Sequence, residues 1–199
     1  DLLGSVISHA DRAGARSVLA EHRYIDADYR SEHSRFYSTT FRRYPSIAHR
    51  LHFFASEMNA TDHLDMARPT AFANCGYLGY CVIRPVDASP VGRTMIAPTS
   101  VLAGHVSCIV EDHVNLFGST LTTDAAPFMA QDFQLGVCVH VTAWVCAYYH
   151  HLRFDAPRIL PADLAGFTPM EHGRLVPSGA VTITQLVQML ERAGLPPVV

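Results

Sequence analysis

Two residues in the stretch "QDFQLGVCVHVTAW" (131–144) could carry out acyl-transfer chemistry together. A cysteine thiolate attacks a carbonyl carbon, and a side-chain amide can donate a hydrogen bond to the oxyanion that forms. Gln131 precedes Cys138 by seven residues, and Gly136 leaves room for a tight turn and an approaching substrate. The stretch predicts half of a cysteine-nucleophile site, with Cys138 as nucleophile and Gln131 as oxyanion donor.

The residues that follow Cys138 must place it correctly. Their apolar positions recur at a spacing close to 3.6 residues, which predicts a helix over 137–152. The first turn of a helix favours a thiolate, because unpaired backbone N–H groups and the helix dipole stabilise an anion there. A buried structural cysteine is the alternative interpretation. We expect Cys146 to be of that buried kind and Trp144 to lie in the core.

This stretch resembles the papain-like cysteine peptidases, including the bacterial bacteriocin-leader peptidases, in which a glutamine shortly precedes a cysteine that opens the central helix. "QDFQLGVC" is similar to that motif, "VCVHVTAWVCAYY" to the helix, and "GAVTITQLVQMLERAGL" to the helix entry that follows. The resemblance covers about residues 127–195. It implies an α+β, papain-like cysteine peptidase fold: a central nucleophile helix packed on an antiparallel sheet, here with an extra helical N-terminal region.

The chain departs from the family pattern in two ways. The family spacing from glutamine to cysteine is six residues, a position that Asp132 occupies here, so Gln134 is a second candidate donor. The family also carries a catalytic histidine on a later strand, and no histidine after Cys138 stands in a strand-like pattern. We therefore expect the base in a missing C-terminal segment or in a second chain.

Two histidines within the chain are weaker candidates for the base. His172 stands in "MEHGR", where no strand is predicted. His105 in "AGHVSCIVED" follows a glycine on a predicted strand and would serve in a permuted order, with Asp112 orienting it. The sequence leaves the identity of the base open between these and an outside source.

The elements expected around the motif form two regions. Residues 1–66 have apolar and aromatic residues at roughly helical spacing, which predicts a mostly helical N-terminal region with its many charges on a solvated surface. Residues 67–199 are expected to form the α+β papain-like region, truncated at its C-terminal end.

The second region contains a β segment at 77–123 and a last helix. Runs of aromatic and β-branched residues predict about four short strands. A helix is expected at 183–193, since Thr182 and Gln185 match a capping box. The four strands are expected at 77–86, 92–98, 105–112 and 113–123.

Composition restricts the partners. The net charge is −3, which argues against a nucleic-acid partner, and no apolar run approaches the ~18 residues of a membrane span. All 15 basic residues are arginine, so no lysine can form a Schiff base. A compositionally biased genome explains the absence of lysine, and delivery into a foreign cytosol is the sharper alternative.

Arg84 and Arg93 flank the turn in "RPVDASPVGRT" and are expected to be ion-paired or to stabilise the turn, with anion binding as the alternative.

Cysteine and histidine patterns restrict the compartment and cofactors. The five cysteines include no CxxC pair, which favours a reducing compartment, although Cys75 and Cys81 are close enough in sequence to pair. No zinc-ligand spacing is present, so we expect no metal and no cofactor. The resemblance to bacterial enzymes implies a cytoplasmic bacterial protein, or one delivered as an effector.

The leading prediction is a cysteine-nucleophile hydrolase or acyl transferase that acts on an amide bond of a peptide or protein. One alternative is a catalytically inactive papain-like binding module that recognises a peptide or protein. A second alternative is a protein-modifying effector or toxin of the deamidase or transglutaminase type. All three use the same predicted scaffold, and only the first and third require a reactive Cys138.

Overall fold

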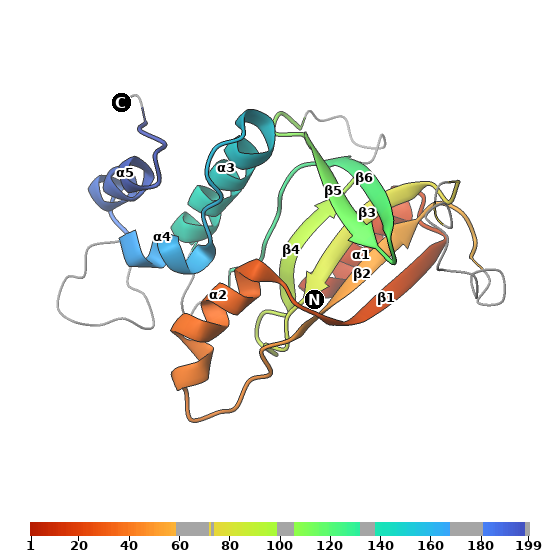
Figure 1. Ribbon diagram of the computed structural model, residues 1–199, viewed down its shortest axis with the longest axis horizontal. Helices are drawn as coiled ribbons and strands as arrows, with labels where there is room; N and C mark the ends of the chain where they lie inside the picture. Colours follow the sequence, from red (N-terminus) through yellow and green to blue (C-terminus); the bar gives the residue numbers. More distant parts are fainter. Residues whose placement is uncertain (59–71, 73, 99–105, 132–137, 168–180, 198–199) are drawn as a thin grey trace.

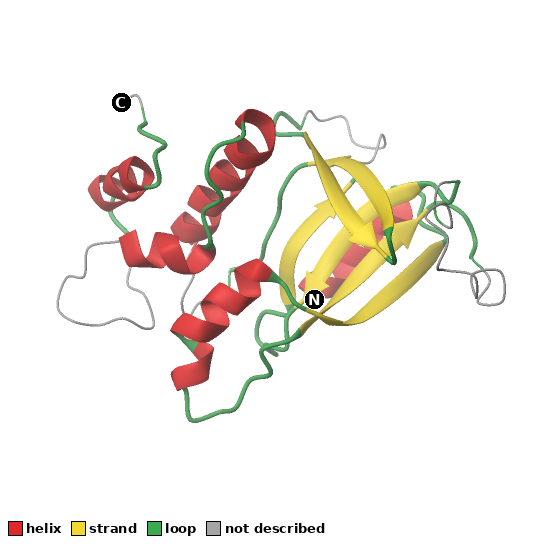
Figure 2. Ribbon diagram, in the orientation of Figure 1, coloured by secondary structure: helices red, strands yellow, loops and turns green. Residues whose placement is uncertain are grey.

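The computed structural model describes residues 1–58, 72, 74–98, 106–131, 138–167 and 181–197 of the 199-residue chain. Within them, five α-helices and two antiparallel sheets form a mixed α+β fold (Figures 1 and 2). The helices are α1 (Leu2–Arg12), α2 (Ala27–Arg35), α3 (Cys138–Phe154), α4 (Pro161–Phe167) and α5 (Ile183–Arg192), with a 3-10 turn η1 at Tyr37–Thr39. The strands are β1 (Ser17–Tyr24), β2 (Ala48–Phe54), β3 (Tyr77–Ile83), β4 (Val91–Ile96), β5 (Val110–Leu116) and β6 (Ser119–Ala125).

The four-stranded sheet separates two hydrophobic clusters. Its strands are ordered β1-β2-β3-β4, and α1 covers one face, where Val6 and Ala10 pack with Phe53 and Ile96. The other face contributes to the larger core, which also includes α2, α3, α4, α5 and the β5–β6 hairpin. Figure 1 shows α1 behind the sheet and α3 beside it. No helix in the described part of the chain has both the length and the apolar character needed to cross a membrane.

Two strands correct the expectation that residues 1–66 are mostly helical. β1 and β2 belong to the same sheet as β3, so the sheet runs across the division expected at residue 66. β1 pairs with β2 from Ser17 opposite Phe54 onward, and most of its residues alternate in exposure. This pairing overrides the helix preference of the alanine, leucine, glutamate and arginine in β1, because strand formation depends on cross-strand neighbours more than on intrinsic propensity.

The β5–β6 hairpin lies later in the chain than expected. β5 begins only at Val110, so the strands predicted at 105–112 and 113–123 were placed about five residues early. The turn is formed by Phe117 and Gly118, whose φ angles of 48° and 82° are both positive, as a two-residue type I′ turn requires. Buried and exposed residues alternate through both strands, so the turn sets which residues face the core.

Four of the remaining elements agree with their predictions. β3 and β4 occupy the segments expected at 77–86 and 92–98, and α5 begins after a capping box in which both hydrogen bonds are formed. The helix predicted at 137–152 is α3, and Trp144 is fully buried in the core. The periodic apolar pattern and the cap therefore predict these elements from local sequence.

Candidate active site

Cys138 lies at the start of a well-formed helix. It is the first residue of the 17-residue α3, and its side chain is exposed. Thr142 Oγ1 donates a hydrogen bond to the Cys138 carbonyl oxygen at 2.9 Å, which closes the first turn. The first backbone N–H groups of a helix have no intrahelical acceptor and favour an anion nearby. Cys138 thus has the exposure and the position that a thiolate nucleophile needs.

A cleft of about 880 Å³ brings Cys138 and Gln131 together. Its walls come from the start of α1, the loop between β3 and β4, residues 128–131 and the first turn of α3. Gln131 is half-buried in this wall. The candidates Asp132 and Gln134 and the turn residue Gly136 lie outside the described residues. The structure therefore places the predicted nucleophile and the first predicted oxyanion donor in one cleft.

Backbone hydrogen bonds fix the wall that carries Gln131. Phe128 and Thr94 pair in both directions, with N–O distances of 2.8 and 3.0 Å, and Ala130 N donates to Val91 O at 3.3 Å. Ser89 Oγ donates to the Gln131 carbonyl oxygen at 2.8 Å. Residues 128–131 thus run as an antiparallel extension beside β4. This arrangement holds the Gln131 backbone at the cleft while α3 holds Cys138.

A buried arginine ties this wall to α2. Arg84 Nη1 donates to the two carboxylate oxygens of Glu32 at 3.0 and 3.2 Å. Its Nη2 donates to Ser89 O, Ser89 Oγ and Ala130 O, at 3.0, 2.8 and 3.0 Å. Only a guanidinium offers this many donors in a fixed plane. The ion-paired role predicted for Arg84 is confirmed, and the structure adds that it supports the cleft.

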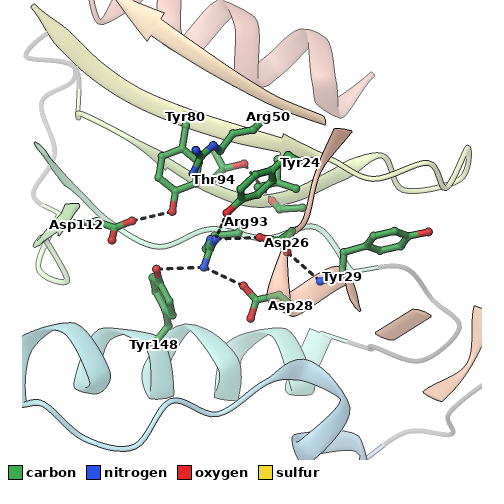
Figure 3. Close-up of polar contacts among 12 residues, drawn as sticks. Tyr24, Asp26, Asp28, Tyr29, Arg50, Tyr80, Arg93, Thr94, Asp112 and Tyr148 are labelled. Atoms are coloured by element: carbon green, nitrogen blue, oxygen red, sulfur yellow. Dashed lines mark hydrogen bonds and ion pairs between the residues drawn. The ribbon is translucent and has the colours of Figure 1, made fainter. Parts of the chain in front are cut away.

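A second buried network holds the middle of α3 against the sheet (Figure 3). Arg93 contacts Asp26 at 2.9 Å and Asp28 at 3.2 Å, and Nη1 donates to the Tyr148 hydroxyl at 3.4 Å. Burial raises the pKa of the Asp26 carboxyl, which the positive charge of Arg93 opposes. The ion-paired role predicted for Arg93 is confirmed as well.

Asp28 links this network to two further donors. Its Oδ1 accepts a hydrogen bond from Trp144 Nε1 at 3.3 Å, and its Oδ2 accepts one from Arg158 Nη2 at 3.0 Å. A buried carboxylate is tolerated when it is paired with charged and N–H donors in this way. The contacts fix the rotation of α3, because Trp144 and Tyr148 lie on its inward face.

The buried charges correct the expectation that the N-terminal region carries its charges on a solvated surface. Asp26, Asp28, Glu32 and Arg50 are each at most 5% exposed. Asp28 and Glu32 are four residues apart, one turn of α2, and contact Arg93 and Arg84 respectively. This four-residue spacing was the signal available in the sequence. It identifies a charged inward face of α2 only once the partner arginines are known.

The predicted histidine base is not placed by the described residues. His105 and His172 lie outside them, and no histidine is among the described residues that line the cleft. His140 is buried within α3, and His151 Nδ1 lies 2.7 Å from the Ala156 carbonyl oxygen after the far end of that helix. Asp112, proposed to orient His105, accepts a hydrogen bond from the Tyr80 hydroxyl at 2.7 Å.

The prediction that Cys146 is a buried cysteine is wrong. Cys146 is exposed, because it lies two residues after buried Trp144, roughly 200° around the helix. It lines a separate pocket of about 400 Å³ with His150, and partial burial raises the pKa of its thiol. Cys75 and Cys81 form no disulfide with each other, and burial raises the pKa of Cys81 to about 11.

The described cleft offers an exposed thiol, a glutamine and fixed backbone. No protein-family model matches the chain, and comparisons with curated proteins and with solved structures find no match. The site geometry therefore carries the assignment of chemistry. The described residues that line the cleft include Cys138 and Gln131 together with the carboxylates of Asp1 and Asp87.

Proposed function

We propose that this chain is a cysteine-nucleophile hydrolase or acyl transferase of the papain-like type, acting on an amide bond of a peptide or protein. The observation that carries the proposal is the exposed thiol of Cys138, which opens α3 and shares a cleft with Gln131. A thiol in this position is open to a substrate, and the first turn of a helix favours an anion nearby.

The proposed reaction has two stages. The Cys138 thiolate attacks the carbonyl carbon, and the Cys138 N–H and the Gln131 amide donate hydrogen bonds to the oxyanion. An imidazole that took the thiol proton returns it to the leaving amine, which departs as the acyl-enzyme forms. Water, or an acceptor amine in an acyl transferase, then attacks the thioester and releases Cys138.

The proposed base is a histidine brought to the cleft by another part of the protein. Within this chain, His105 with Asp112 and His172 are the candidates. A segment that follows residue 199, or a second chain, is the other source. A papain-like arrangement is supported by the mixed α+β fold, in which a helix opened by a cysteine packs beside an antiparallel sheet.

Alkylation tests the nucleophile directly. The protein is treated with iodoacetamide at several pH values, and adducts are mapped by mass spectrometry. We expect Cys138 to react at least tenfold faster at pH 7 than Cys108, which is also exposed and serves as the internal control. If Cys138 reacts no faster than Cys108, it is not activated, and a non-catalytic binding module becomes the better explanation.

Peptide turnover tests the assigned roles. With a fluorogenic peptide library and the longest available natural chain, Cys138→Ala should abolish turnover, and Gln131→Ala should lower kcat by about 10²–10³. Cys146→Ala, on the same helix but outside the cleft, is the matched control and should retain turnover. Turnover that persists in Cys138→Ala would exclude Cys138 as the nucleophile.

A further inference from the structure

Two exposed histidines meet across strands β1 and β2, away from the cleft. His22 Nδ1 and His49 Nδ1 are 3.3 Å apart, and the ring centroids are 5.2 Å apart with an interplanar angle of 81°. Both side chains are exposed to solvent. We propose that this histidine pair binds a divalent transition-metal ion of the zinc, nickel or copper type. The proposal is independent of the proposed enzyme function.

A β-bulge produces this meeting of histidines. The pairing of β1 with β2 shifts between Glu21, opposite Arg50, and Tyr24, opposite Ala48. His22 and Arg23 therefore oppose the single residue His49. Arg23 has a φ of 61°, which is uncommon outside glycine and costs conformational energy. Such bulges redirect side chains and occur often beside functional sites.

The distance between the two nitrogens matches the spacing of a chelating pair. Two imidazole nitrogens that each lie 2.0–2.1 Å from a tetrahedral ion must be about 3.3 Å apart. Without an ion between them, the same two nitrogens are within hydrogen-bond distance, with the donor set by the tautomer. The observed 3.3 Å therefore lies at the spacing for shared coordination. Imidazole nitrogen is a favoured ligand for zinc, nickel and copper.

The neighbouring carboxylate does not contribute to this pair. Glu21 Oε2 is directed to the opposite face, where it accepts from Arg50 Nε at 2.8 Å and lies 3.3 Å from His52 Nε2. Within the described residues, no group of three or more histidine, cysteine, aspartate or glutamate side chains could hold a metal ion. We therefore assign two protein ligands to the site, with water completing the coordination.

Calorimetric titration with Ni²⁺ tests the proposal. The full chain is first treated with iodoacetamide, so that cysteine thiols cannot bind the ion, and circular dichroism confirms that each variant remains folded. We expect a saturable site that His22→Gln and His49→Gln each weaken at least tenfold. His113→Gln is the matched control, because His113 is also an exposed strand histidine but contacts Glu111 and Thr122 instead.

Several outcomes would overturn the proposal. It fails if the unsubstituted chain shows no saturable binding, or if either variant of the pair binds Ni²⁺ as tightly as the unsubstituted chain. It also fails if His113→Gln weakens binding as much as the pair variants do, since binding would then be a general property of exposed histidines. In a proton NMR titration, the ring signals of His22 and His49 should shift before those of His113.

Discussion

The start and the middle of α3 are built in opposite ways. At the start, Cys138 is exposed in a cleft and surrounded by fixed backbone. In the middle, Trp144 and Tyr148 are buried. Trp144 donates a hydrogen bond to Asp28, and Tyr148 accepts one from Arg93. The difference shows how an accessible group can be placed accurately: buried contacts hold the middle of the helix, and its free end carries the exposed thiol of Cys138.

The buried charges that hold α3 contribute more surely to one defined packing of the helix than to the free energy of unfolding. Taking two charges out of water costs more than their attraction returns unless the geometry is well satisfied. Here Asp28 has three donors, from Arg93, Trp144 and Arg158. An apolar contact could slide along α3, whereas this set of directed contacts defines one rotation of the helix.

The largest expected effect comes from breaking the buried network. Asp28→Ala removes the carboxylate that pairs with Arg93 and accepts a hydrogen bond from Trp144. We therefore expect the free energy of unfolding to fall by about 3–5 kcal/mol. Urea denaturation measures this change. Asp87→Ala is the control, because Asp87 pairs with Arg42 on the surface and should change stability by less than about 0.5 kcal/mol. Equal effects of the two substitutions would show that the network does not hold α3.

A smaller change in the free energy of unfolding is expected when the pH is lowered. Burial, aided by the positive charge of Arg50, lowers the pKa of His52 from 6.5 to about 4, although contact with Glu21 opposes this. Between these two values the unfolded chain binds a proton that the folded chain does not. Stability should therefore be complete above pH 6.5 and fall as the pH drops towards 4, by at most about 3 kcal/mol.

The matched variant for this pH effect is His52→Gln. Its unfolding free energy, measured by urea denaturation between pH 7.5 and 4.5, should depend less on pH than that of the unsubstituted chain. An unchanged slope in the variant would assign the pH dependence to groups other than His52.

The smallest effect should come from the exposed end of the helix. Cys138→Ala removes no buried contact, so we expect the unfolding free energy to change by less than about 0.5 kcal/mol while thiol reactivity in the cleft is lost. A destabilisation above 2 kcal/mol would instead identify Cys138 as a structural residue and remove the contrast between the two parts of α3.

Local sequence patterns predict the elements whose determinants lie within a single segment. The capping box at Thr182 and Gln185, the apolar period of α3 and the aromatic run of β3 each occur within one segment. Strand β1 could not be predicted in this way, because it contains helix-favouring residues and becomes a strand through pairing with distant β2. The boundaries of β5 and β6 were misplaced because the turn between them includes Phe117, which is unusual at a positive φ angle.

The candidate site shows the same division. Cys138 and Gln131 were chosen from their types and spacing, and the structure places them in one cleft. The support behind them was not predictable, since Arg84 joins Glu32 to Ser89 over a separation of more than fifty residues. A sequence shows which residues can react, but contacts between distant segments decide what holds them.

The bulge in β1 also affects how molecules of this protein meet one another. β1 is an edge strand, and a flat edge with unpaired backbone groups can recruit strands from other molecules. The irregular register at His22 and the left-handed conformation of Arg23 interrupt that edge, and both side chains are exposed and polar. We therefore expect the bulge in this strand to oppose edge-to-edge association, and a straightened β1 to precipitate at lower concentration.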